Sequence, residues 1–130
     1  MQTTAIKQIF LLLSVAFLLL TACKDQLVTE GTIVFPDSSV SYGSHIEPLF
    51  TTRCLGCHNG AYPPNLSPPS YSALVTYQPQ LIIPGQGNNS LLVQLLDGRA
   101  APIMPPSGEM LNQNQINGIK TWIDEGALNN

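Results

Sequence analysis

Two cysteines and a histidine stand within five consecutive residues, in the stretch Cys54-Leu55-Gly56-Cys57-His58. Thiols and an imidazole at this spacing are compatible with three kinds of chemistry. They could form a disulfide or redox pair, supply part of a zinc site, or attach a haem covalently. The rest of the chain has to decide which of the three these residues perform.

The sequence gives the redox pair and the zinc site little support. Reactive Cys-x-x-Cys pairs lie at the start of a helix in a strand–helix–strand unit, whereas here Cys54 follows a predicted helix. A structural zinc ion takes four ligands, and beyond the motif only His45 remains as a conventional strong ligand. The third cysteine, Cys23, has another predicted use, so none is left for a distant disulfide.

The pattern Cys-x-x-Cys-His is typical of the covalent attachment of a c-type haem. The thiols of Cys54 and Cys57 would form thioethers with the two vinyl groups, and the two intervening residues let them reach adjacent pyrroles. The neighbouring His58 then lies beneath the iron, where its Nε2 atom can bind. We therefore predict one covalently bound haem c, with its iron, held by Cys54, Cys57 and His58.

The opposite face of the iron needs a second ligand, and the candidates are Met104, Met110 and His45. Met104 lies in the stretch "PIMPP" over 102–106, where proline favours extended backbone and can brace a thioether towards a fixed point. Met110 stands next to the cap of the last helix, and we expect it to pack beneath that helix as core filler. Met104 is the predicted ligand, while Met110, His45 and an open or exchangeable site are the alternatives.

The ring of a histidine that binds a metal is usually oriented by a hydrogen bond from its other nitrogen. The loop Pro63-Pro64-Asn65-Leu66 follows His58 closely enough to supply a backbone carbonyl. We expect Pro64 to be the acceptor, with a purely structural role in a turn as the alternative. His45 is expected at the surface.

Three to four short helices, separated by proline-rich loops, are expected to position these residues. The first expected helix runs from about Ser44 to Arg53, with Ser44 and Glu47 as a capping box. One or two helical turns follow over 70–77 after a serine cap, and a short helix capped by Ser90 follows over 91–97. The last expected helix is capped by Asn112 and Gln115 and is stopped by Gly126. Gly118 lies in the middle of the last helix, where glycine costs about 1 kcal/mol relative to alanine. We expect another helix to approach closely there.

The N-terminal segment is typical of an export signal. Lys7 precedes an apolar run over 9–20, which is too short to span a bilayer, and the run ends in Leu20-Thr21-Ala22-Cys23. This ending resembles the lipobox of bacterial lipoproteins, in which the cysteine is lipidated and becomes the mature N-terminus. The alternatives are a plain signal peptide or a membrane anchor, with Cys23 incidental.

This interpretation divides the chain into a lipoprotein signal peptide over 1–22, a lipid-anchored flexible tether over 23–40 and one domain over 41–130. Removal of 22 of the 130 residues leaves 108, enough for one small domain with a modest core. The stretch "TIVF" over 32–35 is predicted to be a short strand or an anchor that packs on the domain. Four cationic side chains remain against eight carboxylates, a formal charge of −4, which makes nucleic acid an unsuitable partner.

Residues 41–128 resemble the class I c-type cytochromes, and most of all the small single-haem domains of bacterial exported proteins. The resemblance is carried by Phe50 four residues before Cys54, by the motif that ends at His58, by Met104-Pro105 and by the last helix with Trp122. It implies an all-α, cytochrome c-like fold whose loops wrap around one covalent haem. It also implies that the first and last helices cross at near right angles, flanked by Phe50 and Trp122, with Gly118 permitting the crossing.

These predictions imply an electron carrier and not an enzyme, because His58 and Met104 together leave the iron no position for a substrate. We expect the protein to be lipid-anchored through Cys23 to a bacterial membrane, facing the periplasm or the cell exterior. We expect a monomer whose partners are redox proteins of a respiratory or dehydrogenase chain. The alternatives are a haem-based gas or redox sensor, a peroxide-handling haem protein with an open sixth site, or an accessory haem domain of a larger membrane oxidoreductase.

Overall fold

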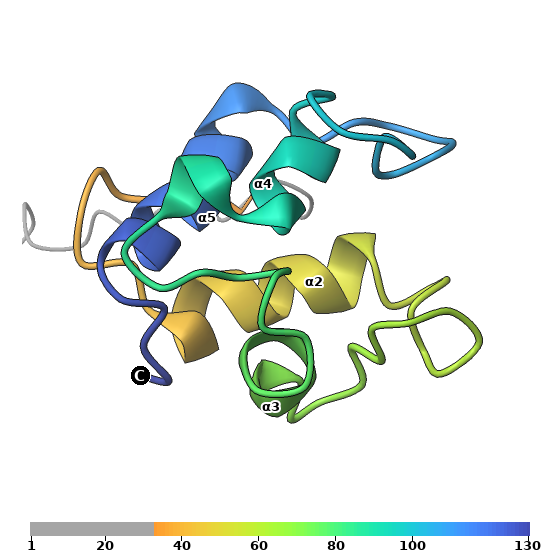
Figure 1. The fold of residues 1–130 in the computed structure, drawn as a ribbon, viewed down its shortest axis with the longest axis horizontal. Helices are drawn as coiled ribbons and strands as arrows, with labels where there is room; N and C mark the ends of the chain where they lie inside the picture. The colour runs from red at the N-terminus through yellow and green to blue at the C-terminus, as the bar shows by residue number, and fades with distance from the viewer. Residues whose placement is uncertain (1–32) are drawn as a thin grey trace, which may run out of the picture. The chain divides into compact units, whose positions relative to one another are not determined.

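Short helices joined by long loops make up residues 33–130, the part of the chain that the computed structural model describes. In chain order the elements are the π-helix η1 (Tyr42–Ile46), α2 (Glu47–Arg53), α3 (Tyr71–Val75), the 3-10 helix η2 (Gly87–Asn89), α4 (Leu91–Leu96) and α5 (Gln113–Asp124) (Figure 1). These residues contain no strand, so the predicted all-α class is confirmed for them. None of their helices has the length and apolar character needed to cross a membrane. The predicted signal peptide and Cys23 lie outside the described residues.

The first helix begins earlier than predicted and has a different cap. Ser41, not Ser44, is the N-cap of η1, and its hydroxyl accepts a hydrogen bond from the Ser44 amide at 3.2 Å. The carboxylate of Glu47 does not complete a capping box, because it accepts a hydrogen bond from the amide of Ser70 at 3.1 Å. Glu47 therefore joins α2 to the start of α3 and does not cap its own helix.

Ser70 and Ser90 precede α3 and α4 as predicted, but neither side chain caps its helix. The hydroxyl of Ser70 pairs with the hydroxyl of Tyr42. The hydroxyl of Ser90 donates to the carbonyl of Gln86 at 3.0 Å and accepts from the amide of Ile83 at 2.9 Å. Both serines are buried, so their hydroxyls serve buried polar groups of other segments instead of the helix ends.

The last helix, α5, agrees with the sequence prediction in detail. The side chain of Asn112 accepts from the amide of Gln115 at 2.9 Å, and the side chain of Gln115 accepts from the amide of Asn112 at 3.0 Å. This is the reciprocal arrangement of a capping box. Ile119, Trp122 and Ile123 are buried along one face. Gly126 follows the helix with a φ of 105°, a left-handed conformation that glycine adopts easily.

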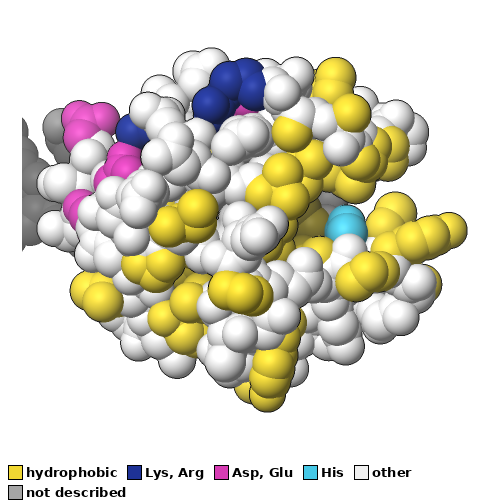
Figure 2. Space-filling view, viewed as in Figure 1, with side chains coloured by type: hydrophobic (Ala, Val, Ile, Leu, Met, Phe, Trp, Pro, Cys, Tyr) yellow, Lys and Arg dark blue, Asp and Glu magenta, His cyan; other side chains and the backbone are white. Residues whose placement is uncertain are grey.

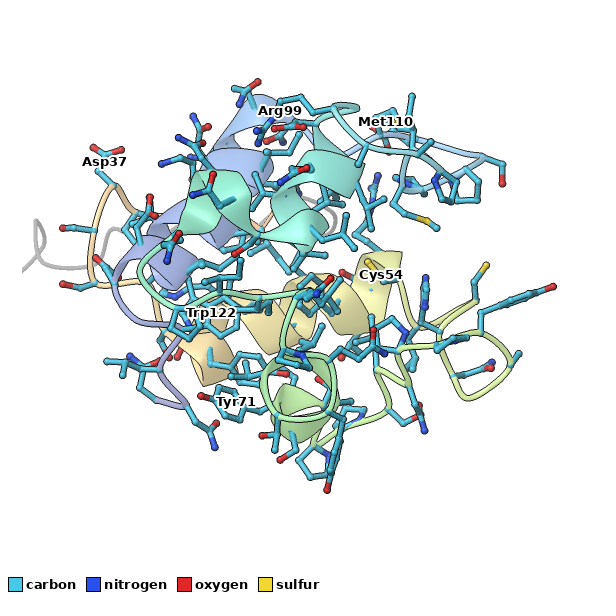
Figure 3. All side chains as sticks on the ribbon, viewed as in Figure 1. Asp37, Cys54, Tyr71, Arg99, Met110 and Trp122 are labelled. Atoms are coloured by element: carbon cyan, nitrogen blue, oxygen red, sulfur yellow. The ribbon has the colours of Figure 1, made fainter. Side chains whose placement is uncertain are left out.

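Trp122 joins α5 to the other helices of the core. Its ring centroid lies 5.4 Å from that of Tyr42 in η1 and 6.5 Å from that of Tyr71 in α3 (Figure 3). Phe50 of α2 is also fully buried in this core. Contacts of this kind between helices distant in sequence hold a small domain together despite its long loops.

The segment 33–41, of which residues 33–40 were predicted to belong to the tether, packs on α5 and lies in the same compact unit as the rest of Ile33–Asn130. Phe35 and Val40 are buried in the core. The side chain of Asn114 bonds both the amide and the carbonyl of Phe35, at 2.8 and 3.1 Å. The carboxylate of Glu125 accepts from two further amides of the segment. Of the two predictions for 32–35, the anchor is confirmed over 33–35, which form no strand.

Gly118 is the position on α5 where this segment comes closest. A Cβ atom on Gly118 would lie 2.1 Å from ring carbons of Phe35, far inside van der Waals contact. The close approach predicted at Gly118 is therefore confirmed, but the prediction that another helix makes it was wrong, because the neighbour is the Phe35 side chain.

We expect the substitution Gly118→Ala to destabilise the domain. Alanine gains about 1 kcal/mol in helix propensity, but its methyl group must displace a buried ring, and overpacking of this kind costs about 1–3 kcal/mol. The midpoint of urea unfolding should therefore fall. In a Phe35→Ala background the methyl group has room, and there Gly118→Ala should be neutral or stabilising. An equal loss of stability in both backgrounds would contradict this account.

Candidate functional site

An apolar cleft separates the end of α2 and the loop that follows it from α4 and the loop that precedes α5. It consists of two adjoining hollows that share Cys54, His58, Leu96 and Met104. The larger encloses about 700 Å³ of empty space, part of it open to solvent. Figure 2 shows the hollow lined by hydrophobic side chains, with a histidine at its mouth.

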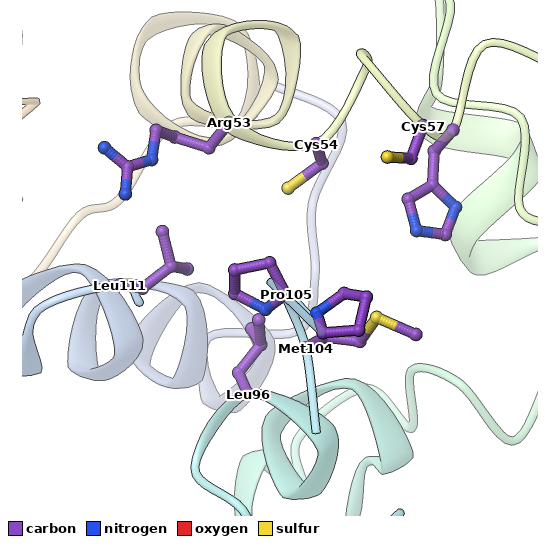
Figure 4. Close-up of a pocket in the computed structure, with 9 residues that line it drawn as sticks. Arg53, Cys54, Cys57, Leu96, Met104, Pro105 and Leu111 are labelled. Atoms are coloured by element: carbon purple, nitrogen blue, oxygen red, sulfur yellow. The ribbon is translucent and has the colours of Figure 1, made fainter. Parts of the chain in front are cut away.

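The cysteine motif begins at the C-terminal end of α2. Cys54 is the C-cap residue, and its amide donates to the carbonyl of Phe50 at 2.9 Å. The chain then turns tightly, because the amides of Cys57 and His58 both donate to the Cys54 carbonyl, at 3.1 and 3.0 Å. This turn brings both thiols and the imidazole to one wall of the cleft, and Figure 4 shows Cys54 and Cys57 there, opposite Met104.

The two thiols are free and lie in different surroundings. Cys57 is exposed, whereas Cys54 is partly buried, and burial raises the pKa of the Cys54 thiol to about 11 against the weaker opposing effect of Arg53. A redox pair works through a readily formed thiolate, which the raised pKa of Cys54 opposes. Among residues 33–130 no group of three or more His, Cys, Asp or Glu side chains is arranged to hold a metal ion, so the zinc alternative gains no support.

The ring of His58 is oriented by the loop that follows it. Its Nδ1 atom lies 3.2 Å from the carbonyl oxygen of Pro64, and because a carbonyl can only accept, Nδ1 carries the hydrogen. The amide of Leu66 donates to the His58 carbonyl at 2.6 Å and holds the same loop in place. The predicted role of Pro64 is confirmed. This bond leaves Nε2 as the ring nitrogen that could serve as an axial ligand.

Met104 reaches the cleft from the opposite wall and lines both hollows. Its backbone is not helical, as the flanking prolines predicted. Its amide donates to the carbonyl of Leu95 at 2.9 Å, which fixes the residue against α4. Met104 is partly buried and packs against the core, so its thioether is held near the cysteine motif without a helix to carry it.

The two alternative ligands lie elsewhere. Met110 is 45% exposed, so the prediction that it packs beneath the last helix was wrong, and the next residue, Leu111, is buried instead. His45 is partly exposed, and its Nδ1 atom accepts a hydrogen bond from the amide of Ser41 at 3.0 Å. Neither Met110 nor His45 lines the hollows of the cleft.

The sequence did not reveal which side chains would form the apolar walls. The helix α4 supplies Leu91, Leu92, Leu95 and Leu96 to the larger hollow. A signal was present in its sequence, because five of the six residues of "LLVQLL" are apolar. A short helix that is apolar on nearly every side must bury more than one face. One face of α4 packs in the core through Val93, and the remaining leucines line the cleft.

These residues fit a c-type haem. The thiols are free, Nε2 of His58 is available, a thioether lies across the cleft, and the walls are mostly leucine and proline. Comparison of the chain with protein-family models, with curated proteins and with solved structures found no match. The assignment of the cleft therefore depends on the chemistry of its own residues.

Proposed function

We propose that the cleft holds one covalently bound haem c and that the protein carries electrons as a single-haem, cytochrome c-like domain. The observation that carries this proposal is the convergence of Cys54, Cys57, His58 and Met104 on one apolar cleft. Met104 follows His58 by 46 positions in the sequence, so their meeting is a property of the fold and not of local sequence.

Each of these residues has a distinct proposed role. The thiols of Cys54 and Cys57 would form the thioether links, and His58 would supply Nε2 to the iron. Met104 would supply its thioether as the second ligand. When bound, haem supplies one-electron chemistry through its ferric and ferrous states. A histidine and methionine pair raises the reduction potential of a haem, and if both residues bound the iron, no position would remain on it for a substrate.

The setting of this activity is part of the proposal. We propose that Cys23 is lipidated, that the domain stands on the extracytoplasmic side of a bacterial membrane, and that it meets redox partner proteins there as a monomer. The motivation is the ending Leu20-Thr21-Ala22-Cys23 after the apolar run. Wild-type protein should incorporate labelled fatty acid and a Cys23→Ser variant should not. Label that persists in the variant would exclude this anchor.

The optical spectra of the oxidised and reduced protein test the proposed function directly. Reduction should give the sharp bands of a six-coordinate haem, and carbon monoxide at neutral pH should bind to the reduced protein only slowly. Rapid binding of carbon monoxide would favour a sensor or a peroxide-handling protein with an open sixth site. A purified protein without any haem would refute the proposal.

A further inference from the structure

Arg53, the last residue of α2, links the cysteine motif to the segment that follows Met104. Its Nη2 atom donates to the backbone carbonyl of Glu109 at 2.7 Å, and its Nη1 atom donates to the carboxylate of the same residue at 3.1 Å. Arg53 also lines the smaller hollow, and Figure 4 shows it next to Cys54. One side chain thus connects the two walls of the cleft.

These two bonds are important because residues 105–111 have few other attachments. Within the part of the chain that the structure describes, the segment makes no other hydrogen bond to the rest of the molecule. Residues 106–110 are exposed. The attachments on either side are the amide of Met104, bonded to α4, and the buried side chain of Leu111. Arg53 is therefore the restraint in the middle of the segment.

The two bonds from Arg53 differ in what they can restrain. The side chain of Glu109 is 84% exposed, and an exposed ion pair contributes little. The side chain of Arg53 is only 25% exposed, and its charge-assisted bond to the carbonyl holds the backbone itself. We therefore assign the restraint to the bond between Nη2 and the carbonyl of Glu109.

We propose that Arg53 is a positioning residue that keeps the thioether of Met104 on the iron by holding the backbone at Glu109. This inference rests on the proposed function and deepens it. Pro105 and Pro106 limit the freedom of the chain between Met104 and Glu109, so a restraint at Glu109 also limits the movement of the thioether. Loss of the bond frees the segment and lets the methionine leave the iron more often.

Carbon monoxide binding to the reduced protein measures how often the thioether leaves the iron. Arg53→Ala should raise the rate of carbon monoxide binding about tenfold, the scale expected for loss of one charge-assisted hydrogen bond. It should also weaken the far-red sulfur-to-iron absorption band of the oxidised protein. Arg53→Lys keeps the charge at the end of α2 but not the planar fork, and it should give an intermediate rate. Glu109→Ala keeps the carbonyl and should stay within about twofold of the wild type.

Arg99→Ala is the matched control, because Arg99 bonds Asp97 and the carbonyl of Asn88 and not the segment 105–111. This variant removes the same charge, and its rate of carbon monoxide binding should equal that of the wild type. Equal rates in Arg53→Ala and Arg99→Ala would overturn the proposal. If carbon monoxide bound to Glu109→Ala as fast as to Arg53→Ala, the proposal would also be overturned, because the carboxylate of Glu109 would then be the restraint.

Backbone nitrogen-15 relaxation over residues 107–110 gives a second readout that does not require haem, because it reports backbone motion directly. The order parameters should be lower in Arg53→Ala than in the wild type and unchanged in Arg99→Ala. Order parameters that do not respond to Arg53→Ala would overturn the proposal. Wild-type protein without haem would refute the proposed function separately, and the relaxation data would still decide whether Arg53 holds the segment.

Discussion

A variant with both Cys54→Ser and Cys57→Ser is expected to release all of its haem on acid–organic extraction, whereas the wild-type polypeptide keeps haem after the same treatment. The difference is expected because haem in the wild type would be attached through covalent thioether bonds. Only the thiols can add to the vinyl groups, and a serine hydroxyl in the same place forms no thioether. The measurement is the absorbance of haem that stays with the denatured chain.

Single variants extend this prediction. Cys54→Ser and Cys57→Ser each retain one thiol on the wall of the cleft, so each should keep a fraction of its haem through a single thioether. Cys23→Ser is the control, because it removes a cysteine outside the motif and should leave attachment intact. Haem that extracts freely from the wild type, or that stays with the double variant, would contradict the assignment of the motif.

The substitution Met104→Ala is expected to remove the weak far-red sulfur-to-iron band of the oxidised protein. It should also lower the reduction potential and open the reduced iron to carbon monoxide, because the soft thioether favours ferrous iron. The expected loss of the band is complete, since Met104 is the methionine that lines the cleft.

Met110→Ala is the natural control for this experiment. Met110 is 45% exposed, so its truncation should change stability by no more than about 0.5 kcal/mol and should leave the band in place. The reverse pattern, with the band lost in Met110→Ala and kept in Met104→Ala, would move the ligand to Met110.

The sequence predicted best where the evidence for an element was local. In α5 the cap at Asn112, the apolar face through Trp122 and the stop at Gly126 all lie within fifteen residues, and they agree with one another. The orientation of His58 by Pro64 was also predictable, because six positions separate the two residues. In both cases the groups involved find their partners nearby, and no other residue in the described part of the chain competes for them.

Some predictions were wrong because a residue distant in the sequence supplies the hydrogen-bonding or packing partner of a side chain. Glu47 was expected to cap its own helix, but Ser70, 23 positions later, takes its carboxylate. Gly118 signalled a close neighbour correctly, yet the sequence could not identify Phe35 because the two lie far apart in the chain. Met110 and Leu111 show a finer difficulty: a loop has no period, so nothing in its sequence indicated which of the two would point inward.

The packing of Phe35 against Gly118 determines how short the chain can be made before the domain stops folding by itself. A protein that starts at Tyr42 would lack Phe35 and Val40, both buried, and would expose the face of α5 on which Phe35 lies. The side chain of Asn114 would lose its backbone partner as well. The residues from Ile33 to Asn130 form one compact unit, so a shortened form of the protein has to retain Phe35 and Val40 to keep this packing.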